Sequence, residues 1–179
     1  EFKFFHQDKS GLLWGMANTV KSGGDQIYPF DPLGEIFLTD RALKCIDSTT
    51  LFSLDGDDRD NLWVGTSRDG FFKIPLDSTY VESIRGENII DDMVLDLAIS
   101  SRGEVWAGTI SSGLARIDAD NGLTRFITEK DGLLNNTIQS VTEDDQGKLW
   151  LDTPEGLTIY NPMTENFRQL SLLRELGLN

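Results

Sequence analysis

Short stretches of alternating apolar and polar residues run through the whole chain, and turn residues separate them. A period of two is typical of β-strands that bury one face. The segments between the stretches are rich in Gly, Asp, Asn and Ser, as hairpin loops are. Only residues 172–176 have helical composition, and that segment is too short for a stable helix. In the third quarter of the chain the pattern predicts strands at residues 94–99, 105–109, 114–117 and 123–127.

The four tryptophans mark an internal repeat. They are separated by 49, 43 and 44 residues, and a Leu or Val precedes each of them. Units of four short strands that recur every 40 to 50 residues are the mark of a β-propeller blade. The sequence therefore predicts an all-β fold: a β-propeller of four repeats of roughly 45 residues, each a four-stranded antiparallel blade.

Two kinds of glycine recur around the tryptophans. One stands three positions before the Trp, where a tight turn requires positive φ, and the other stands six or seven positions after it and opens the next strand. We interpret the tryptophans as packing anchors between blades and not as platforms for sugar rings, because they recur at the same point of every repeat. The predicted repeat anchors are Trp14, Trp63, Trp106, Trp150, Gly11, Gly103, Gly147, Gly70, Gly113 and Gly156.

The repeat predicts one propeller segment over residues 1–179. Propellers typically have four to eight blades, so four repeats could close into a tight ring, pair with a second chain, or form part of a larger propeller. The first repeat diverges most from the others, as terminal repeats do, and we therefore expect part of a larger propeller that self-associates through exposed blade faces. The predicted blades are about 1–40, 41–85, 86–130 and 131–170, with a C-terminal link at 171–179.

The sequence around the later tryptophans is similar to a known family. Residues 144–150 read Asp-x-x-Gly-x-Leu-Trp, residues 106–109 read Trp-Ala-Gly-Thr, and a Gly-Leu strand that ends in Asp follows at 113–118. Together with the link at 131–138, these motifs resemble the two-component regulator propeller repeat.

The resemblance implies a periplasmic or other extracytoplasmic sensor region of a bacterial hybrid histidine kinase or a related signalling protein. It also implies that a kinase or cyclase output domain lies elsewhere in the full-length protein. The expected ligand is a saccharide or another small molecule.

Charge and composition limit the partners. The chain contains sixteen Lys and Arg and thirty Asp and Glu, and the resulting net charge of −14 repels nucleic acids and anionic membranes. No apolar run has the length of a membrane span, so we expect no direct membrane insertion. With one His and one Cys, neither a catalytic triad nor a His-based zinc site is expected. The acidic run at 55–60 does not have EF-hand spacing, and we expect no metal, no cofactor and no catalysis by this segment.

Ligands of propellers usually lie over the central channel, where loops from several blades converge. In this chain the relevant loops are those that link blades and those between the second and third strands of a blade. The predicted ligand contacts are Arg68, Asp69, Arg85, Asn88, Ser111, Asn135 and Asn136.

Two other functions stay open at the level of the sequence. A propeller glycosidase or polysaccharide lyase would need several acidic side chains in one channel, and its Asp-box motif fits poorly because Thr never precedes the Trp. A protein-interaction scaffold of the WD type would carry Trp-Asp dipeptides, which this chain lacks. We favour a non-catalytic sensor, and the net charge favours a neutral or cationic saccharide over a sulfated polyanion.

Overall fold

The computed structural model is built of β-strands. Over the residues that the structure describes there are sixteen strands and no α-helix. No helix within these ranges has the length and hydropathy needed to cross a membrane. The described residues are 2–19, 24–39, 43, 50–76, 82–84, 92–118 and 124–170.

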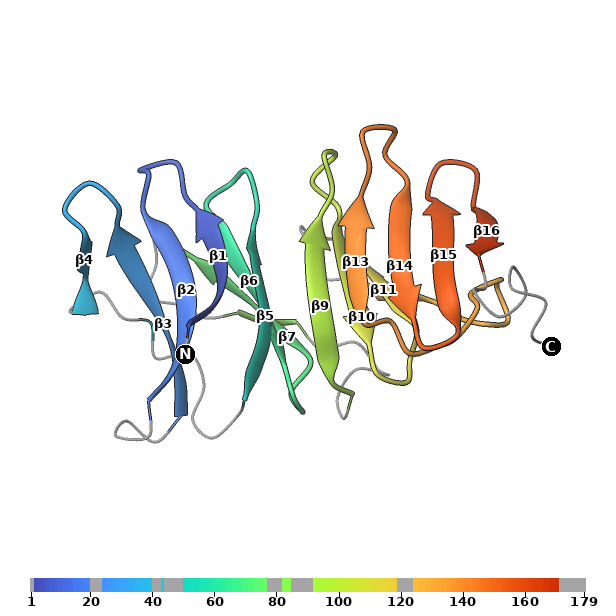
Figure 1. Cartoon of the computed structure of the whole chain (residues 1–179), viewed down its shortest axis with the longest axis horizontal. Coiled ribbons are helices and arrows are strands. Elements are labelled where there is room, and N and C mark those ends of the chain that lie inside the picture. The colour runs from blue at the N-terminus through green and yellow to red at the C-terminus, as the bar shows by residue number, and fades with distance from the viewer. Residues whose placement is uncertain are drawn as a thin grey trace.

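The strands form four antiparallel sheets, each made of four consecutive strands that pair in chain order (Figure 1). Blade 1 consists of β1 (Phe2–Gln7), β2 (Leu13–Thr19), β3 (Gly24–Asp31) and β4 (Ile36–Phe37). Blade 2 consists of β5 (Leu51–Gly56), β6 (Asn61–Thr66), β7 (Phe71–Pro75) and β8 (Glu82–Ile84). Blade 3 consists of β9 (Val94–Ile99), β10 (Val105–Thr109), β11 (Leu114–Ile117) and β12 (Thr124–Ile127). Blade 4 consists of β13 (Ser140–Glu143), β14 (Leu149–Thr153), β15 (Gly156–Asn161) and β16 (Asn166–Leu170).

The predicted all-β propeller with four four-stranded repeats is confirmed. Three of the four strands predicted in the third repeat have the predicted bounds. The fourth is described from Thr124 to Ile127, and its predicted first residue, Leu123, lies outside the described residues. The ranges predicted for whole blades and for the C-terminal link stay predictions, since most of the links lie outside the described residues.

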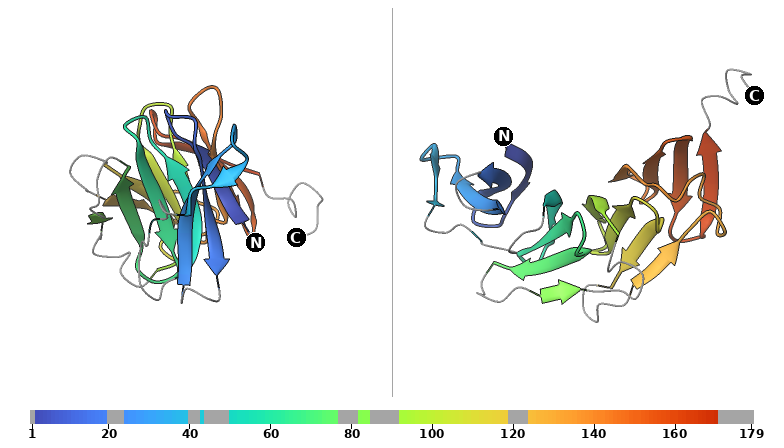
Figure 2. Two further views of the ribbon diagram at one scale, coloured as in Figure 1. Left: turned by 90° about the vertical axis from the view of Figure 1, so that its left-hand side faces the viewer. Right: turned by 90° about the horizontal axis from the view of Figure 1, so that it is seen from below.

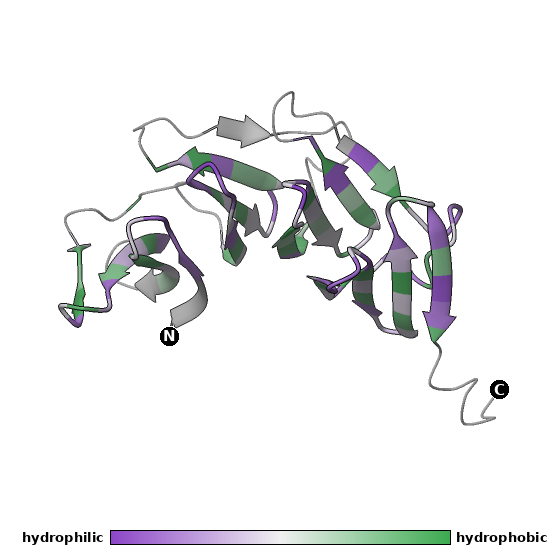
Figure 3. Cartoon of the chain, turned by 90° about the horizontal axis from the view of Figure 1, so that it is seen from above, coloured by the Kyte–Doolittle hydropathy of each residue, from purple (hydrophilic) through white to green (hydrophobic). Residues whose placement is uncertain are grey.

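The four blades stand side by side along an open arc (Figures 2 and 3). The innermost strands β5 and β9 lie on its concave side, and the outermost strands β8 and β12 lie on its convex side. Blade 1 and blade 4 occupy the two ends of the arc and do not meet. The described residues therefore do not form the closed four-blade ring considered from the sequence.

An aspartate holds the turn between the first two strands of blade 2. One oxygen of Asp57, Oδ1, accepts the backbone N–H groups of Arg59 and Asn61 at 2.9 and 3.0 Å. The other oxygen, Oδ2, accepts the indole N–H of Trp63 at 2.9 Å. Asp60 takes a φ of 59° in this turn, where the other blades have the predicted glycine at positive φ. The same carboxylate-to-indole bond joins Asp8 to Trp14 and Asp144 to Trp150.

The tryptophans pack each blade against the following one. Trp63 and Trp106 are fully buried, and Trp14 is 6% exposed. Trp63 shares a hydrophobic cluster with Val94 and Leu97 of blade 3. A Trp in one blade thus fills the space between it and the next blade.

Trp150 differs from the other three tryptophans. It is 38% exposed, because no described sheet follows blade 4. On β14 the side chains alternate: Leu149 and Leu151 are buried against blade 3, while Trp150 and Asp152 are exposed. On β6 and β10, by contrast, every residue is buried. Within the described residues Trp150 therefore does not act as the inter-blade anchor that the repeat predicts.

This difference predicts unequal effects of truncating two equivalent tryptophans. Trp106→Ala removes a fully buried ring and should lower the free energy of unfolding by about 3–5 kcal/mol. Trp150→Ala removes a ring that is already partly in water and should cost on the order of 1 kcal/mol. Urea unfolding of both variants measures the difference. Equal losses, or an unchanged melting temperature for Trp106→Ala, would contradict the packing described above.

Blade 3 has a serine in place of the turn aspartate. Ser100 Oγ accepts the backbone N–H of Glu104 at 3.0 Å, but the buried indole N–H of Trp106 has no hydrogen-bond partner. Ser100→Asp should supply that partner and raise the free energy of unfolding by about 1 kcal/mol. The gain should disappear in a Trp106→Phe background, which lacks the indole N–H. A gain of equal size in both backgrounds would mean that the indole is not involved.

Candidate functional site

The loops predicted to bind a ligand gather at one end of the strands, the lower end in Figure 1. The described ones among them include the turn around 67–69 in blade 2, the turn around 110–112 in blade 3 and the link at 128–137, and the turn at 154–155 in blade 4 lies at the same end. We call these four segments the loop face.

A buried aspartate fixes the part of the loop face that belongs to blade 3. Asp92 is 5% exposed, and its Oδ2 accepts the backbone N–H groups of Ser112 and Ser111 at 2.8 and 3.3 Å. The predicted contact Ser111 is exposed, so its backbone is fixed while its side chain faces solvent. Sequence reasoning missed Asp92, although it stands 14 positions before Trp106, as Asn136 does before Trp150.

The two predicted asparagines hold the link between blades 3 and 4. Asn135 Oδ1 accepts the N–H of Thr137 at 2.7 Å, and its Nδ2 donates to Glu155 at 3.0 Å. Asn136 exchanges two 2.9 Å hydrogen bonds with Glu129: its Oδ1 accepts the Glu129 N–H, and its own N–H donates to the Glu129 carboxylate. Both side chains therefore support the loop.

Two of the other predicted contacts lie on blade 2, and two lie outside the described residues. Arg68 is exposed in the turn of blade 2, and the backbone of Asp69 is tied there by a 2.9 Å hydrogen bond to Thr66 Oγ1. Arg85 and Asn88 lie outside the described residues. The structure thus joins the Ser111 turn to Asn136, whose carbonyl accepts the Gly113 N–H at 3.0 Å, and leaves Arg68 and Asp69 on the neighbouring turn.

Carboxylates on the innermost strands tie each blade to the next. Asp55 Oδ2 accepts the N–H of Ile99 at 3.0 Å, and Asp96 Oδ2 accepts the N–H of Val141 at 2.9 Å. Burial raises the pKa of the Asp96 carboxyl, and the nearby charge of Asp55 adds to the rise despite the hydrogen bonds that Asp96 accepts. The single histidine, His6, lies half-buried with Nδ1 3.6 Å from Asp55 Oδ1.

A pocket of about 520 Å³ lies between blades 1 and 2 at the turn end of the strands. Its apolar wall includes Leu12 and Trp14, and its acidic groups are Asp8 and Asp60. Burial by itself raises the pKa of the Asp8 carboxyl, but hydrogen bonds from Ser10, Trp14 and Leu12 outweigh burial and lower that pKa. The Asp8 oxygens are therefore committed to the turn.

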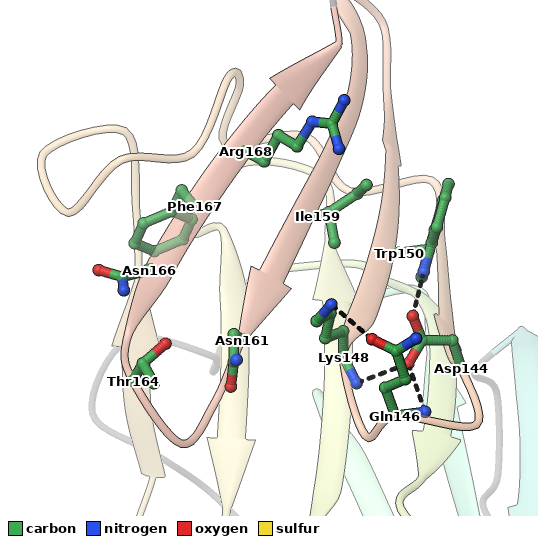
Figure 4. Close-up of a pocket in the computed structure, with 10 residues that line it drawn as sticks. All are labelled: Asp144, Gln146, Lys148, Trp150, Ile159, Asn161, Thr164, Asn166, Phe167 and Arg168. Atoms are coloured by element: carbon green, nitrogen blue, oxygen red, sulfur yellow. Dashed lines mark hydrogen bonds between the residues drawn. The ribbon is translucent and has the colours of Figure 1, made fainter.

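A second pocket, of about 370 Å³, lies on the outer face of blade 4 (Figure 4). Trp150, Ile159 and Arg168 lie side by side there on three neighbouring strands. Neither of these two pockets includes a residue predicted to bind the ligand. Among the described residues, no three His, Cys, Asp or Glu side chains come together as metal ligands would.

Four antiparallel four-stranded blades stand side by side along an arc, with their innermost strands on its concave side. This arrangement defines the class of fold, which is that of a β-propeller. Residues 132–155 match the family described as Two component regulator propeller. The matched residues span the end of the link and the Trp150 hairpin, and they include the motif at 144–150 that resembles this repeat.

Solved structures share the fold at low identity. Two structures of the extracellular domain of BT4673 from B. thetaiotaomicron, described once as a one component and once as a hybrid two component system, are 19% and 16% identical, with TM-scores of 0.69 and 0.71. They cover 88% and 96% of this chain. PorZ, a surface component of the type-IX secretion system of Porphyromonas gingivalis, is 17% identical over 96% of the chain, with a TM-score of 0.63.

The fold also occurs in an enzyme. The GH74 enzyme of Niastella koreensis is 12% identical over 95% of the chain, with a TM-score of 0.66. This chain spans 21% and 24% of the length of the two BT4673 structures, 33% of PorZ and 30% of the GH74 enzyme. A comparison with curated protein sequences finds no match.

The aspartates of the turns and of the innermost strands should respond to pH in opposite directions. Burial by itself raises the pKa of Asp57, but hydrogen bonds from Trp63 and Asn61 outweigh it and hold the pKa below its ordinary value of 3.8. The stability that ionised Asp57 contributes is thus present at pH 7 and is lost only at acid pH, below about 3.8. Because the pKa of Asp96 is raised, its ionised form costs stability at pH 7, and protonation relieves that cost as the pH falls.

Two isosteric variants test whether Asp57 and Asp96 affect stability in opposite directions as the pH falls. Asp57→Asn should lose about 1–3 kcal/mol at pH 7, because an amide N–H group then faces buried N–H donors, and the deficit relative to wild type should shrink at acid pH. Asp96→Asn keeps an oxygen that accepts the Val141 N–H, so it should lower the free energy of unfolding less at pH 7. Its deficit relative to wild type should grow as the pH approaches 4, because the wild type gains stability when Asp96 is protonated. Unfolding curves between about pH 3 and 7 measure both trends. If the stability of both variants relative to wild type changed in the same direction with pH, the opposite pKa shifts given to Asp57 and Asp96 would be wrong.

Proposed function

We propose that this chain is part of the non-catalytic ligand-sensing propeller of a bacterial two-component or related signalling protein. The observation that carries the proposal is the match of residues 132–155 to the two-component regulator propeller repeat. The likeness of the fold to the extracellular domain of BT4673, which is described as a signalling system, supports it. On the same grounds we propose an extracytoplasmic location, with the output domain in another part of the full-length protein.

The loop face is the proposed ligand site. Its turns are fixed by buried groups, since Asp92 binds the Ser111 turn and Thr66 binds the Arg68 turn. Ser111 and Arg68 themselves are exposed. Fixed backbone with exposed polar side chains is the arrangement that preorganised recognition loops need. We propose Arg68, Asp69 and Ser111 as direct contacts, Asn135 and Asn136 as residues that position the loop, and Arg85 and Asn88 as further contacts.

A glycosidase is the weaker proposal. Retaining and inverting glycosidases use two carboxyl groups that flank the bond to be cleaved. Asp55 and Asp96 are carboxylates on the innermost strands, but each accepts a backbone N–H group from the next blade. Their bonds are structural, and we therefore propose binding without hydrolysis. Turnover of a glycoside that a single Asp or Glu substitution abolishes would overturn this proposal.

A binding experiment tests the site and the ligand class together. Neutral, cationic and sulfated oligosaccharides should be titrated side by side by calorimetry, and the net charge of −14 leads us to expect the sulfated ligands to bind weakest. Arg68→Ala and Ser111→Ala should each weaken binding by roughly two- to tenfold, the value of one hydrogen bond. Arg59→Ala, at the opposite end of blade 2, is the matched control and should leave binding unchanged.

Three results would count against the proposal. Tighter binding of sulfated ligands would overturn the expected ligand class. Equal binding by wild type and both loop-face variants would remove the site from the loop face. Failure of every saccharide in the panel to bind would overturn the saccharide proposal and leave the other small ligands.

A further inference from the structure

Blades 2 and 3 each place a cation over their own tryptophan. Lys73 Nζ lies 5.8 Å from the centroid of the Trp63 ring, and Arg116 Cζ lies 5.6 Å from that of the Trp106 ring. Both cations stand on the third strand, directly across from the tryptophan in the register of the sheet. The negative face of an indole ring attracts a cation at this distance. The position across from the tryptophan is therefore a cation position in these two blades.

In blade 1 uncharged residues hold the equivalent positions. The residue across from Trp14 is Pro29. In blade 3 the cation Arg116 also forms an ion pair with Glu104, which stands two residues before the tryptophan. The equivalent residue of blade 1 is Leu12. Blade 1 thus lacks both members of the ion pair that blade 3 places beside its tryptophan.

The pocket of about 520 Å³ lies at the equivalent place in blade 1, since Trp14 and Leu12 both line it. Ser10 of the same turn lines it as well, and blade 2 contributes Asp60 and Leu76. Sites for small molecules usually have volumes of about 300–1,000 Å³ and mainly apolar walls that carry a few polar groups. The pocket therefore has the size and the lining of such a site.

The charges of the pocket favour a cation. The described residues that line it include two carboxylates, Asp8 and Asp60, and no basic side chain. Burial raises the pKa of Asp8, but the hydrogen bonds that its carboxylate accepts outweigh burial and lower that pKa, so Asp8 is ionised at neutral pH. Lys9 lies beside the pocket, with Nζ 3.5 Å from Asp60 Oδ2, and balances one of the two negative charges. A negative charge is left beside the indole ring.

We propose that this pocket binds a small organic cation, with an ammonium or guanidinium group on an apolar stem. The charged group takes the place over the Trp14 ring that Lys73 and Arg116 take in their own blades. The stem lies along Leu12 and Leu76. The site is at the opposite end of the strands from the loop face, so it is a second site and does not depend on the ligand proposed above (Figure 1).

Matched probes test the requirement for charge. Pentylammonium, pentylguanidinium and pentanol have the same apolar stem, and only the first two carry a charge. Calorimetry should show that both cations bind about tenfold or more tightly than pentanol, because only they are attracted by the indole ring and the carboxylates. Equal binding of pentanol, or no saturable binding of either cation, would overturn the proposal. Binding of a lysine-containing peptide but of neither free cation would also overturn it and would indicate a protein partner.

A cation supplied by the chain itself should close the site. Trp14 is 6% exposed, so its truncation would disturb the packing of the blades, and the sharper variant adds a side chain. Pro29→Arg puts a guanidinium across from Trp14, as Arg116 is across from its tryptophan, and should weaken binding of pentylammonium by about tenfold or more. Pro29→Ala also replaces the proline but adds no charge, and it should bind as the wild type does. Circular dichroism checks that both variants keep their strands. Wild-type affinity in Pro29→Arg would mean that the cation does not lie over the Trp14 ring.

The charged residues at the pocket should act in opposite directions. Asp60→Asn removes a negative charge and should weaken binding of pentylammonium by about two- to fivefold, and asparagine tolerates the φ of 59° at this position. Lys9→Ala removes the cation that competes for Asp60 and should tighten binding by a similar factor. Asp58→Asn, at an exposed residue of the same turn that does not line the pocket, is the matched control and should leave binding unchanged. Weaker binding in Lys9→Ala, or equal effects of Asp58→Asn and Asp60→Asn, would overturn the placement of the cation in this pocket.

Discussion

The bond between an aspartate and the indole N–H of a tryptophan organises the turn and the packing anchor in three of the four described blades, 1, 2 and 4. In blade 2, Asp57 closes the turn through one oxygen and accepts the Trp63 N–H through the other. Complete burial of a tryptophan is costly unless its one polar atom finds a partner, and in blade 2 the turn supplies that partner within the same hairpin. The ring is thereby fixed in orientation before the next blade packs on it. Blade 3 lacks the aspartate, and the N–H of its buried Trp106 has no partner.

The packing of one blade on the next makes stability a property of pairs of blades. Each hydrophobic cluster combines a tryptophan with aliphatic residues of the following sheet, so a ring on which no described sheet packs is partly exposed, as at Trp150. Asp55 and Asp96 accept hydrogen bonds from backbone N–H groups of the following blade, and these bonds reinforce the same contacts on the concave side. An excess of acidic residues is therefore compatible with this fold, because many of the carboxylates serve as hydrogen-bond acceptors.

The sequence predicts the features that repeat and fails on those that depend on neighbours. The period of the tryptophans and the alternation along residues 94–117 give the fold and the strand bounds, because both are local patterns. The exposure of Trp150 depends on whether another sheet packs on its ring, and the repeat motif around the ring does not encode that. The engagement of Asn136 with Glu129 likewise depends on how a link folds back on itself. The sequence therefore predicts the loops as a region, whereas the hydrogen bonds that Asn135 and Asn136 form within the link required the structure.

The repeat also explains how one scaffold can present different side chains on its loop face. Thr66, Thr109 and Thr153 each donate a hydroxyl hydrogen bond to the carbonyl of the glycine that ends the following turn. This latch uses only the threonine side chain and backbone groups, so it fixes the turn whatever side chains lie between its two ends. Blade 2 carries Arg68 in the turn, and blade 3 carries Ser111. Because the latch keeps the backbone constant, substitutions within the turns change the chemistry of the loop face while the packing of the blades stays the same.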